Sequence, residues 1–302
     1  MANEVETNAI LDQLHDQGFA IMNNFLAPDL VDAARAEVML IVEEHAQKLM
    51  TTGAIKDLYV DESFETRFIQ IHKEAPENAP DHLRKELHRP GLYDVFFNHT
   101  LLDIVENVLG PEIRLYPNYT VRPKMPGQPK TDVLWHQDAG YTEYWHKSGS
   151  RDVSKLRMIN LWTPLVPATV ENGAMQFIAG SHNMELFPHE QRKYYLEIPN
   201  ELIIPYSDRI VDIEVNPCDL ILFSNMLCHR GPPNKSDGIR WNIDWRYQDA
   251  TQPTMREEEG HIARSQKYPD SVIRNQQEWA NSSSGYTYNP HLGGNKAKSS
   301  TS

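Results

Sequence analysis

Apolar residues recur every three or four positions in the first third of the chain. The segment 27–49 has this spacing throughout, which predicts a helix with one buried face. A second helical pattern at 100–109 stops at Gly110, before a proline, as helices commonly do. Another helix is expected at 80–87. The pattern therefore predicts a largely helical part over residues 1–111, with a short strand and turn at 18–26.

The pattern changes after Glu112, where short runs rich in β-branched and aromatic residues alternate with turns rich in Gly, Pro, Asn and Asp. Runs of this size and spacing are typical of antiparallel sandwiches and barrels rather than of a parallel α/β sheet. We therefore expect a mainly β protein with a helical layer. Its core, at residues 112–250, is predicted to be a double-stranded β-helix, the cupin-like jelly roll.

The remainder of the chain is more polar. A helical C-terminal part is expected at 251–285, so that residues 1–285 would form a single domain. The Gly- and Ser-rich segment 286–302 is expected to be a flexible tail.

The amino-acid composition indicates which kinds of binding partner are disfavoured. The chain has 42 acidic and 29 basic residues and a formal net charge of −13, which disfavours nucleic acid and anionic membranes as partners. Two cysteines are too few for a disulfide framework, and no run approaches the roughly 18 apolar residues of a spanning helix. We therefore expect a soluble, acidic, cytoplasmic protein.

Three residues of the β-rich part have the chemistry of a metal site. Because neighbouring side chains on a strand alternate between faces, a strand over 134–138 would put His136 and Asp138 on the same face. The apolar run 219–229 would bring His229 to the end of a buried strand. Two histidines and one carboxylate on one face of an octahedron are the ligand set of non-haem Fe(II) oxygenases. Three positions stay open, two for a chelating co-substrate and one for dioxygen.

A second His-x-carboxylate triplet, at His72–Glu74, also fits this pattern. Such triplets occur by chance about once in a chain of this composition, so the triplet alone is weak evidence. The position of His136 among predicted strands, against helix and loop signals around His72, favours His136.

Arg240 follows His229 by eleven residues. The turn between them would return the chain as the next antiparallel strand, at 239–247, with Arg240 beside His229. A buried guanidinium needs an anionic partner, and the distal carboxylate of a dicarboxylate co-substrate could supply one through a bidentate pair. A pair with Asp237 or Asp244 is the alternative.

Four motifs in a fixed order resemble the phytanoyl-CoA dioxygenase family of Fe(II)/2-oxoglutarate oxygenases. The spacing of 91 residues between Asp138 and His229 is also similar, and the resemblance extends over about residues 13–249. The motifs are WHQD at 135–138, NLWTPL at 160–165, ENGAMQFIAGSH at 171–182 and HRGPPNKSDGIR at 229–240.

This resemblance implies Fe(II) at His136, Asp138 and His229, 2-oxoglutarate at Arg240, and O2 as the oxidant. Halogenating relatives carry a small residue in place of the metal carboxylate, so Asp138 indicates hydroxylation or another oxidation. Many members have Ser or Thr two residues after the distal histidine, where this chain has Gly231. The resemblance also implies co-substrate contacts from Gln137, Trp162 and Thr120. The hydroxyl that Gly231 lacks would come from Thr163. The role of Gln137 conflicts with the strand alternation, which would put its side chain on the opposite face from His136 and Asp138.

The expected activity is therefore that of an Fe(II)/2-oxoglutarate-dependent dioxygenase that hydroxylates an aliphatic C–H bond of a small metabolite and releases succinate and CO2. Two alternatives remain: a cupin-like metalloenzyme that does not use 2-oxoglutarate, and a catalytically silent binding protein on the same fold. Cys228 is expected to pack in the core. Candidate substrate contacts are Tyr116, Asn118, Tyr141 and Arg246, with Tyr119, Tyr144, Trp145 and His182 as further neighbours of the pocket.

Overall fold

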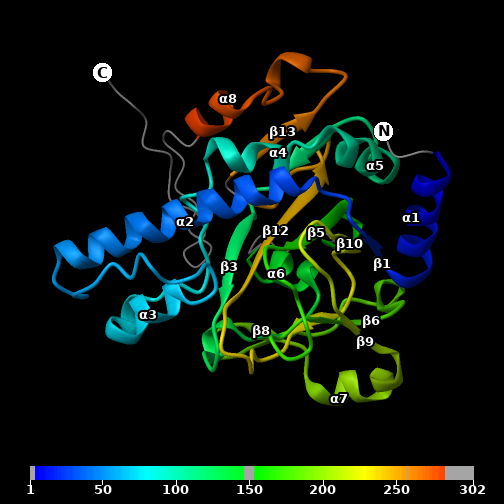
Figure 1. Cartoon of the computed structure of the whole chain (residues 1–302). Coiled ribbons are helices and arrows are strands. Elements are labelled where there is room, and N and C mark those ends of the chain that lie inside the picture. Colours follow the sequence, from blue (N-terminus) through cyan, green and yellow to red (C-terminus); the bar gives the residue numbers. More distant parts are fainter. Residues whose placement is uncertain (1–3, 146–152, 257, 283–302) are drawn as a thin grey trace.

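The structure is a computed structural model that describes residues 4–145, 153–256 and 258–282 (Figure 1). Its larger sheet has seven strands in the order β1-β10-β5-β12-β2-β13, with β3 also paired to β12, and every pairing is antiparallel. The strands are β1 (Phe19–Met22), β2 (Ile113–Leu115), β3 (Thr120–Lys124), β5 (Met158–Pro164), β10 (Leu220–Ser224), β12 (Arg240–Asp249) and β13 (His261–Arg264).

A smaller antiparallel sheet has the order β4-β11-β6-β9. Aromatic side chains of both sheets, such as Phe223 and Phe177, pack together in one cluster, so the two sheets face each other. This is the jelly roll that the sequence predicts. The strands are β4 (Val133–His136), β6 (Met175–Ile178), β9 (Ile210–Ile213) and β11 (His229–Gly231), and β7 (Glu190–Gln191) with β8 (Leu196–Glu197) forms a separate ribbon.

Several of the helices, such as the long helix α2, cover the outer face of the larger sheet. Figure 1 shows α2 as the long helix that crosses the view, with α5 and α8 towards its upper edge. Within the described ranges, none of the helices is long and apolar enough to span a membrane. They are α1 (Glu4–Gln17), α2 (Pro28–Thr51), α3 (Arg67–Glu74), α4 (Tyr93–Phe96), α5 (His99–Leu109), α6 (Asp138–Trp145), α7 (Asn200–Ile203) and α8 (Gln276–Asn281).

Strand β12 separates the apolar core from the pocket. Its apolar residues Trp241, Ile243, Trp245 and Tyr247 are fully buried in the cluster that includes the helices. The residues that alternate with them are polar and line an internal pocket: Arg240, Asn242, Asp244 and Arg246. The strand period of two therefore directs one face to the core and the other to the pocket.

Three sequence-based expectations are wrong in detail. Residues 80–87 are not a helix, because Leu83 pairs with Val121 and so completes the free edge of β3. The C-terminal part includes strand β13, paired with β2, as well as the short helix α8. The run 219–229 is divided by a turn, so that β10 lies in the larger sheet and β11 in the smaller one. The expected tail at 286–302 lies outside the described residues.

Helix α3 buries the side chain of His72. His72 is 4% exposed, its ring packs on Phe68, and its Nδ1 lies 3.1 Å from the carbonyl oxygen of Ala75. Burial lowers the pKa of His72 to about 4, from an ordinary value of 6.5.

We expect His72 to make folding acid-sensitive. Because the folded pKa is depressed, the neutral ring contributes stability fully above pH 6.5, and this is lost as the pH falls towards 4. Between pH 7 and 5 the wild type should lose about 2 kcal/mol more unfolding free energy than His72→Phe. Urea unfolding at several pH values measures this difference. The exposed-site variant His15→Gln should follow the wild type, and equal acid sensitivity of His72→Phe and wild type would contradict the prediction.

Candidate metal centre and active-site pocket

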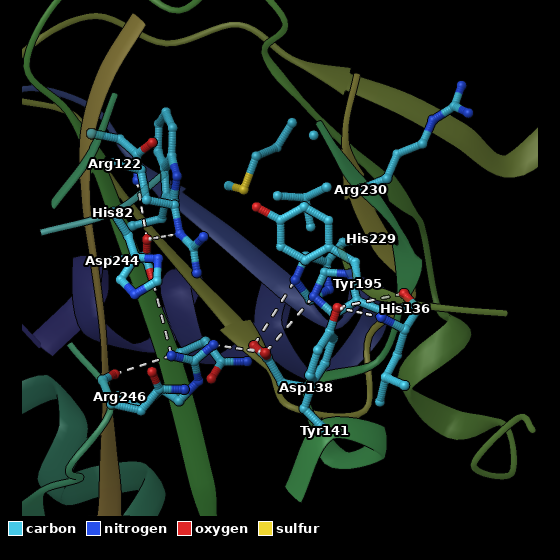
Figure 2. Close-up of a pocket in the computed structure, with 18 of the residues that line it drawn as sticks. His82, Arg122, His136, Asp138, Tyr141, Tyr195, His229, Arg230, Asp244 and Arg246 are labelled. Carbon is cyan, nitrogen blue, oxygen red and sulfur yellow. Dashed lines mark hydrogen bonds and ion pairs between the residues drawn. The ribbon is translucent and has the colours of Figure 1, made fainter. Parts of the chain in front are cut away.

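Three elements bring the predicted ligands together. His136 ends β4, Asp138 begins α6 and His229 begins β11, with His136 and His229 paired across the two strands. The Nε2 atoms of His136 and His229 lie 3.8 and 3.9 Å from Oδ1 and Oδ2 of Asp138, and one ligand atom of each residue lies within 4.8 Å of the others. Figure 2 shows the three side chains converging. Asp138 reaches this position from a helix start, so the predicted single strand over 134–138 was wrong.

Both imidazoles are oriented by the backbone. Nδ1 of His136 lies 2.8 Å from the carbonyl oxygen of Leu134, and Nδ1 of His229 lies 2.9 Å from that of Leu227. Such a bond places the proton on Nδ1 and leaves Nε2 as the metal-binding atom. Burial lowers the pKa of each ring, which favours the neutral form that a metal ligand requires.

Asp138 is held as a carboxylate. Nη2 of Arg246 donates to its Oδ1 at 2.6 Å, whereas its buried Oδ2 has no hydrogen-bond donor among the described residues. Burial raises the pKa of Asp138, but Arg246 and the two imidazoles outweigh burial and hold the pKa below its usual range. A carboxylate with one orphaned oxygen, close to the Nε2 atoms of two histidines, is the donor set of a divalent transition metal, and it fits Fe(II).

The start of α6 depends on a close contact. Gly140 lies against the ring of His189, and a Cβ at this glycine would be 2.2 Å from Cε1 of that ring. The same ring accepts a hydrogen bond from the backbone nitrogen of Gln137 at 3.0 Å. A larger residue at 140 would therefore displace the turn that presents Asp138.

The inner face of β12 forms the opposite wall. Nη1 of Arg240 donates to Asn242 at 2.7 Å, and Asn242 donates to Asp244 at 3.2 Å. Asp244 also accepts from Nε of Arg122 at 2.9 Å. Figure 2 shows Arg122, Asp244 and Arg246 across the pocket from the two imidazoles. A continuous polar chain thus runs along β12 towards the ligand Asp138.

Arg240 lies in the larger sheet, not on the strand next to His229. The turn after β11 crosses between the sheets, and β12 pairs with β2, β3 and β5. Arg240 is 4% exposed, its guanidinium carbon lies 5.1 Å from the ring centre of Trp162, and its Nε has no acceptor within the described part of the chain. Asp244 pairs with Arg122 instead, and the described residues include no ion pair of Arg240.

Four predicted contacts are not among the residues that line the pocket. The amide of Gln137 donates to the carbonyls of Met226 and Glu185 and accepts from the backbone of Phe187. The other three are hydroxyls bonded to backbone carbonyl oxygens: Thr120 donates to Leu83, Thr163 to Asp219 and Tyr116 to Thr254. Because these polar groups are already bonded within the protein, the structure gives no support to the roles expected for Gln137, Thr120, Thr163 and Tyr116, which stay predictions.

The other candidates divide into two groups. Trp162, Asn118, Tyr141 and Arg246 line the pocket, which has a volume of roughly 420 Å³. Outside it, Tyr119 packs beside His88 and His182 bonds to the backbone of His15, while Cys228 is buried in an apolar cluster. The side chains of Tyr144 and Trp145 lie outside the described part. The triplet at 72–74 belongs to α3, where Glu74 bonds to Tyr59 rather than joining His72.

The sequence analysis missed Asn160 and Arg84, which also line the pocket. Asn160 is 1% exposed, and neither its Oδ1 nor its Nδ2 has a partner among the described residues. A polar amide between the apolar residues Ile159 and Leu161 of β5 was the available signal. For Arg84 the sequence offered no such signal, because this residue lies in the segment 80–87, which was predicted to be a helix.

Comparisons with known proteins agree with this site. A family model described as Phytanoyl-CoA dioxygenase (PhyH) matches residues 14–242. The chain is 26% identical over 259 residues to the 1-deoxypentalenic acid 11-beta-hydroxylase of Streptomyces arenae, covering 80% of this chain and 81% of the relative. It is 23% identical over 276 residues to the Phytanoyl-CoA dioxygenase domain-containing protein 1 of Danio rerio, covering 78% and 88%.

Solved structures show the same fold. EctD from S. alaskensis, solved with 2-oxoglutarate and 5-hydroxyectoine, has a TM-score of 0.54 at 18% identity and covers 90% of this chain and 84% of its own. The non-heme alpha ketoglutarate dependent carbocyclase SnoK from nogalamycin biosynthesis has a TM-score of 0.53 at 18% identity, covering 80% and 83%.

Fold and site together define a non-haem iron, 2-oxoglutarate-dependent oxygenase of the jelly-roll type. The chain belongs to the phytanoyl-CoA dioxygenase family.

Arg246 should act as a positioning residue for the metal ligand Asp138. We expect Arg246→Met to weaken Fe(II) or Mn(II) binding about 10- to 100-fold, because the carboxylate loses the donor that orients it. Anaerobic metal titration measures this, with His136→Ala as the reference for a lost ligand. An unchanged metal affinity in Arg246→Met, with His136→Ala impaired, would contradict this role.

Proposed function

We propose that this enzyme hydroxylates an aliphatic C–H bond of a small organic metabolite. The observation that carries the proposal is the joint presence, in one pocket, of a complete His-Asp-His cluster and of a separate buried arginine, Arg240, on the facing sheet. The two cysteines are free thiols, which supports a cytoplasmic location for the reaction.

His136, Asp138 and His229 would hold the iron through Nε2, a carboxylate oxygen and Nε2. When bound, Fe(II) with 2-oxoglutarate and O2 supplies the oxidation, in which one oxygen atom enters succinate, the other enters the substrate as a hydroxyl group, and CO2 leaves. The retained carboxylate of Asp138 completes the ligand set and so supports hydroxylation over halogenation.

Arg240 would hold the distal carboxylate of 2-oxoglutarate. Burial lowers the pKa of Arg240 to about 9, although Asp244 opposes this shift, and its Nε has no acceptor among the described residues. A bidentate carboxylate would supply the missing charge and the acceptor for Nε. The face of Trp162 holds the guanidinium in place.

Asn160 would add a neutral contact between the arginine and the metal cluster. It faces Arg246 across β5 and β12, and its buried amide offers two donors and an acceptor to a bound ligand. Apolar side chains around it, Leu161, Trp162 and Phe223, exclude water from the reacting centre. This protects both the oxidant and the bound substrate.

The hydroxylation itself is tested by isotope labelling. Small metabolites are first screened for stimulated succinate release, and the active one is turned over under ¹⁸O2. We expect one labelled oxygen atom in the alcohol product and one in succinate, measured by mass spectrometry. A desaturated or cyclised product without label would contradict hydroxylation and leave the oxygenase class intact.

The assignment of Arg240 predicts a specific loss. Arg240→Gln should raise the dissociation constant of 2-oxoglutarate about 10- to 100-fold, because a charged, bidentate contact is removed, and Arg240→Lys should be intermediate. Anaerobic calorimetric titration of the metal-loaded protein measures it. The control Lys193→Gln removes a positive charge from the exposed rim of the same pocket and should bind 2-oxoglutarate as the wild type does. Equal affinity in Arg240→Gln would mean that another group holds the distal carboxylate and would contradict the assignment of Arg240.

A further inference from the structure

Lys124 lies beside Arg240 on the pocket side of the larger sheet. The two residues are paired across the antiparallel strands β3 and β12. Residues directly opposite each other in such a pair place their side chains on the same face, with Cβ atoms about 5 Å apart. Because Arg240 lines the pocket, Lys124 extends into the space between the sheets at the Arg240 end. Only 2% of Lys124 is exposed, so two basic side chains are buried next to each other.

The ammonium group of Lys124 connects the two sheets. Its Nζ donates to the carbonyl oxygens of Gly231 at 2.8 Å and Thr131 at 3.0 Å, and it lies 3.5 Å from Oδ1 of Asp132. Gly231 belongs to β11 of the smaller sheet and lines the pocket, two residues after the metal ligand His229. Lys124 itself is not among the residues that line the pocket, so it would act through its charge and through the position of Gly231.

Two glycines make room for this lysine. A Cβ at Gly173 would lie 2.5 Å from Cε of Lys124, and Gly173 has a φ of +80°, a conformation that favours glycine. A Cβ at Gly231 would lie 3.5 Å from Nζ, so the ammonium group approaches the face of Gly231 that a side chain would cover. The backbone around position 124 therefore accommodates a long side chain that ends beside the pocket wall.

The charges at this end of the pocket do not balance among the described residues. Lys124 and Arg240 are both buried, Asp132 is paired with Lys124, and the described residues include no ion pair of Arg240. Burial, together with Arg240, lowers the pKa of Lys124 to about 7, although Asp132 opposes this shift. A further anion at this end would favour the charged form of Lys124 and offset its repulsion from Arg240.

A purely structural role does not require this charge. Apolar side chains of similar volume often replace buried ion pairs without loss of stability, so packing of the two sheets alone would not call for a lysine. A buried lysine next to a buried arginine instead indicates that the positive charge is used.

We propose that Lys124 is a positioning residue for 2-oxoglutarate: its charge strengthens the binding of the distal carboxylate at Arg240, and its hydrogen bond fixes Gly231 at the same end of the pocket. The proposal rests on the proposed function, because it assumes that 2-oxoglutarate binds at Arg240. The consequence is selectivity. The pocket should prefer a 2-oxoacid with a distal carboxylate over one without it, and Lys124 should contribute to that preference in addition to Arg240.

The test compares two probes, 2-oxoglutarate and 2-oxopentanoate, which carry a carboxylate and a methyl group at the distal carbon. Both are titrated by calorimetry into the anaerobic, Fe(II)-loaded protein, and the ratio of their dissociation constants is the measured quantity. Lys124→Met should reduce the preference for 2-oxoglutarate about tenfold, because a nearby positive charge is removed. Altered packing alone would weaken both probes equally and leave the ratio unchanged, and that result would overturn the proposal.

Two further variants separate the charge from other effects. Lys124→Gln keeps a donor for the carbonyl oxygens without the charge, and it should lower the ratio as Lys124→Met does. The control Lys130→Met removes another lysine that donates to a backbone carbonyl, that of Ala79, from the turn η3 (Pro129–Thr131), and it should keep the wild-type ratio. An unchanged ratio in Lys124→Gln, or equal losses in Lys124→Met and Lys130→Met, would contradict the role of Lys124. Thermal unfolding of each variant verifies that it is folded.

Arg240→Gln measures the contribution of Lys124 without altering that residue. We expect Arg240→Gln to retain at least about a threefold preference for 2-oxoglutarate over 2-oxopentanoate, because Lys124 remains, and the double variant with Lys124→Met to lose it. Absence of any remaining preference in Arg240→Gln would overturn the proposal, whether or not the Lys124 variants fold.

The same titrations distinguish this inference from the proposed function. If the wild-type protein prefers 2-oxoglutarate and Lys124→Met keeps the full preference, only the role of Lys124 fails. If the wild-type protein does not bind 2-oxoglutarate, the proposed function itself fails.

Discussion

The ion pair between Arg246 and Asp138 joins the two sheets at the reacting centre. A buried carboxylate with no counter-charge would be costly, and it would take up a proton rather than bind a metal. Arg246, on the larger sheet, prevents this by donating to Oδ1 of Asp138, while Oδ2, which has no donor among the described residues, lies 3.9 Å from Nε2 of His229. The metal site therefore exists only when the sheets are correctly packed, which couples the chemistry to the jelly-roll fold.

The other residues of β12 also depend on correct packing of the larger sheet. The polar, pocket-facing residues of β12 alternate with four large apolar residues that are buried beneath the helices. A shift of the strand by one residue would therefore bury its charged side chains in the core. The hydrogen bonds from Arg240 to Asn242 and on to Asp244 then fix where each guanidinium can lie. A single strand thus sets the position of the proposed 2-oxoglutarate anchor relative to the metal ligand.

Local patterns in the sequence were sufficient for the jelly roll, for α2 and α5 and for the three metal-binding side chains. The contacts of Thr120, Thr163 and Gln137 were not predictable, because a hydroxyl or amide next to an active site can bond to backbone just as well as to a ligand, and only the tertiary arrangement decides. The helix expected at 80–87 failed for a related reason. Leu83 completes the edge of β3, which is a long-range pairing that no local period can reveal.

Net charge misleads about this pocket, because it averages over the whole surface whereas recognition depends on the few groups that a ligand meets. Acidic residues make the chain strongly negative, yet the described pocket lining is predominantly cationic. In a site shielded from water, a buried arginine such as Arg240 would act on a ligand far more strongly than exposed carboxylates at a distance, since solvent and salt screen the latter. An acidic chain can therefore be selective for an anion, and the negative exterior helps to restrict that attraction to the pocket mouth.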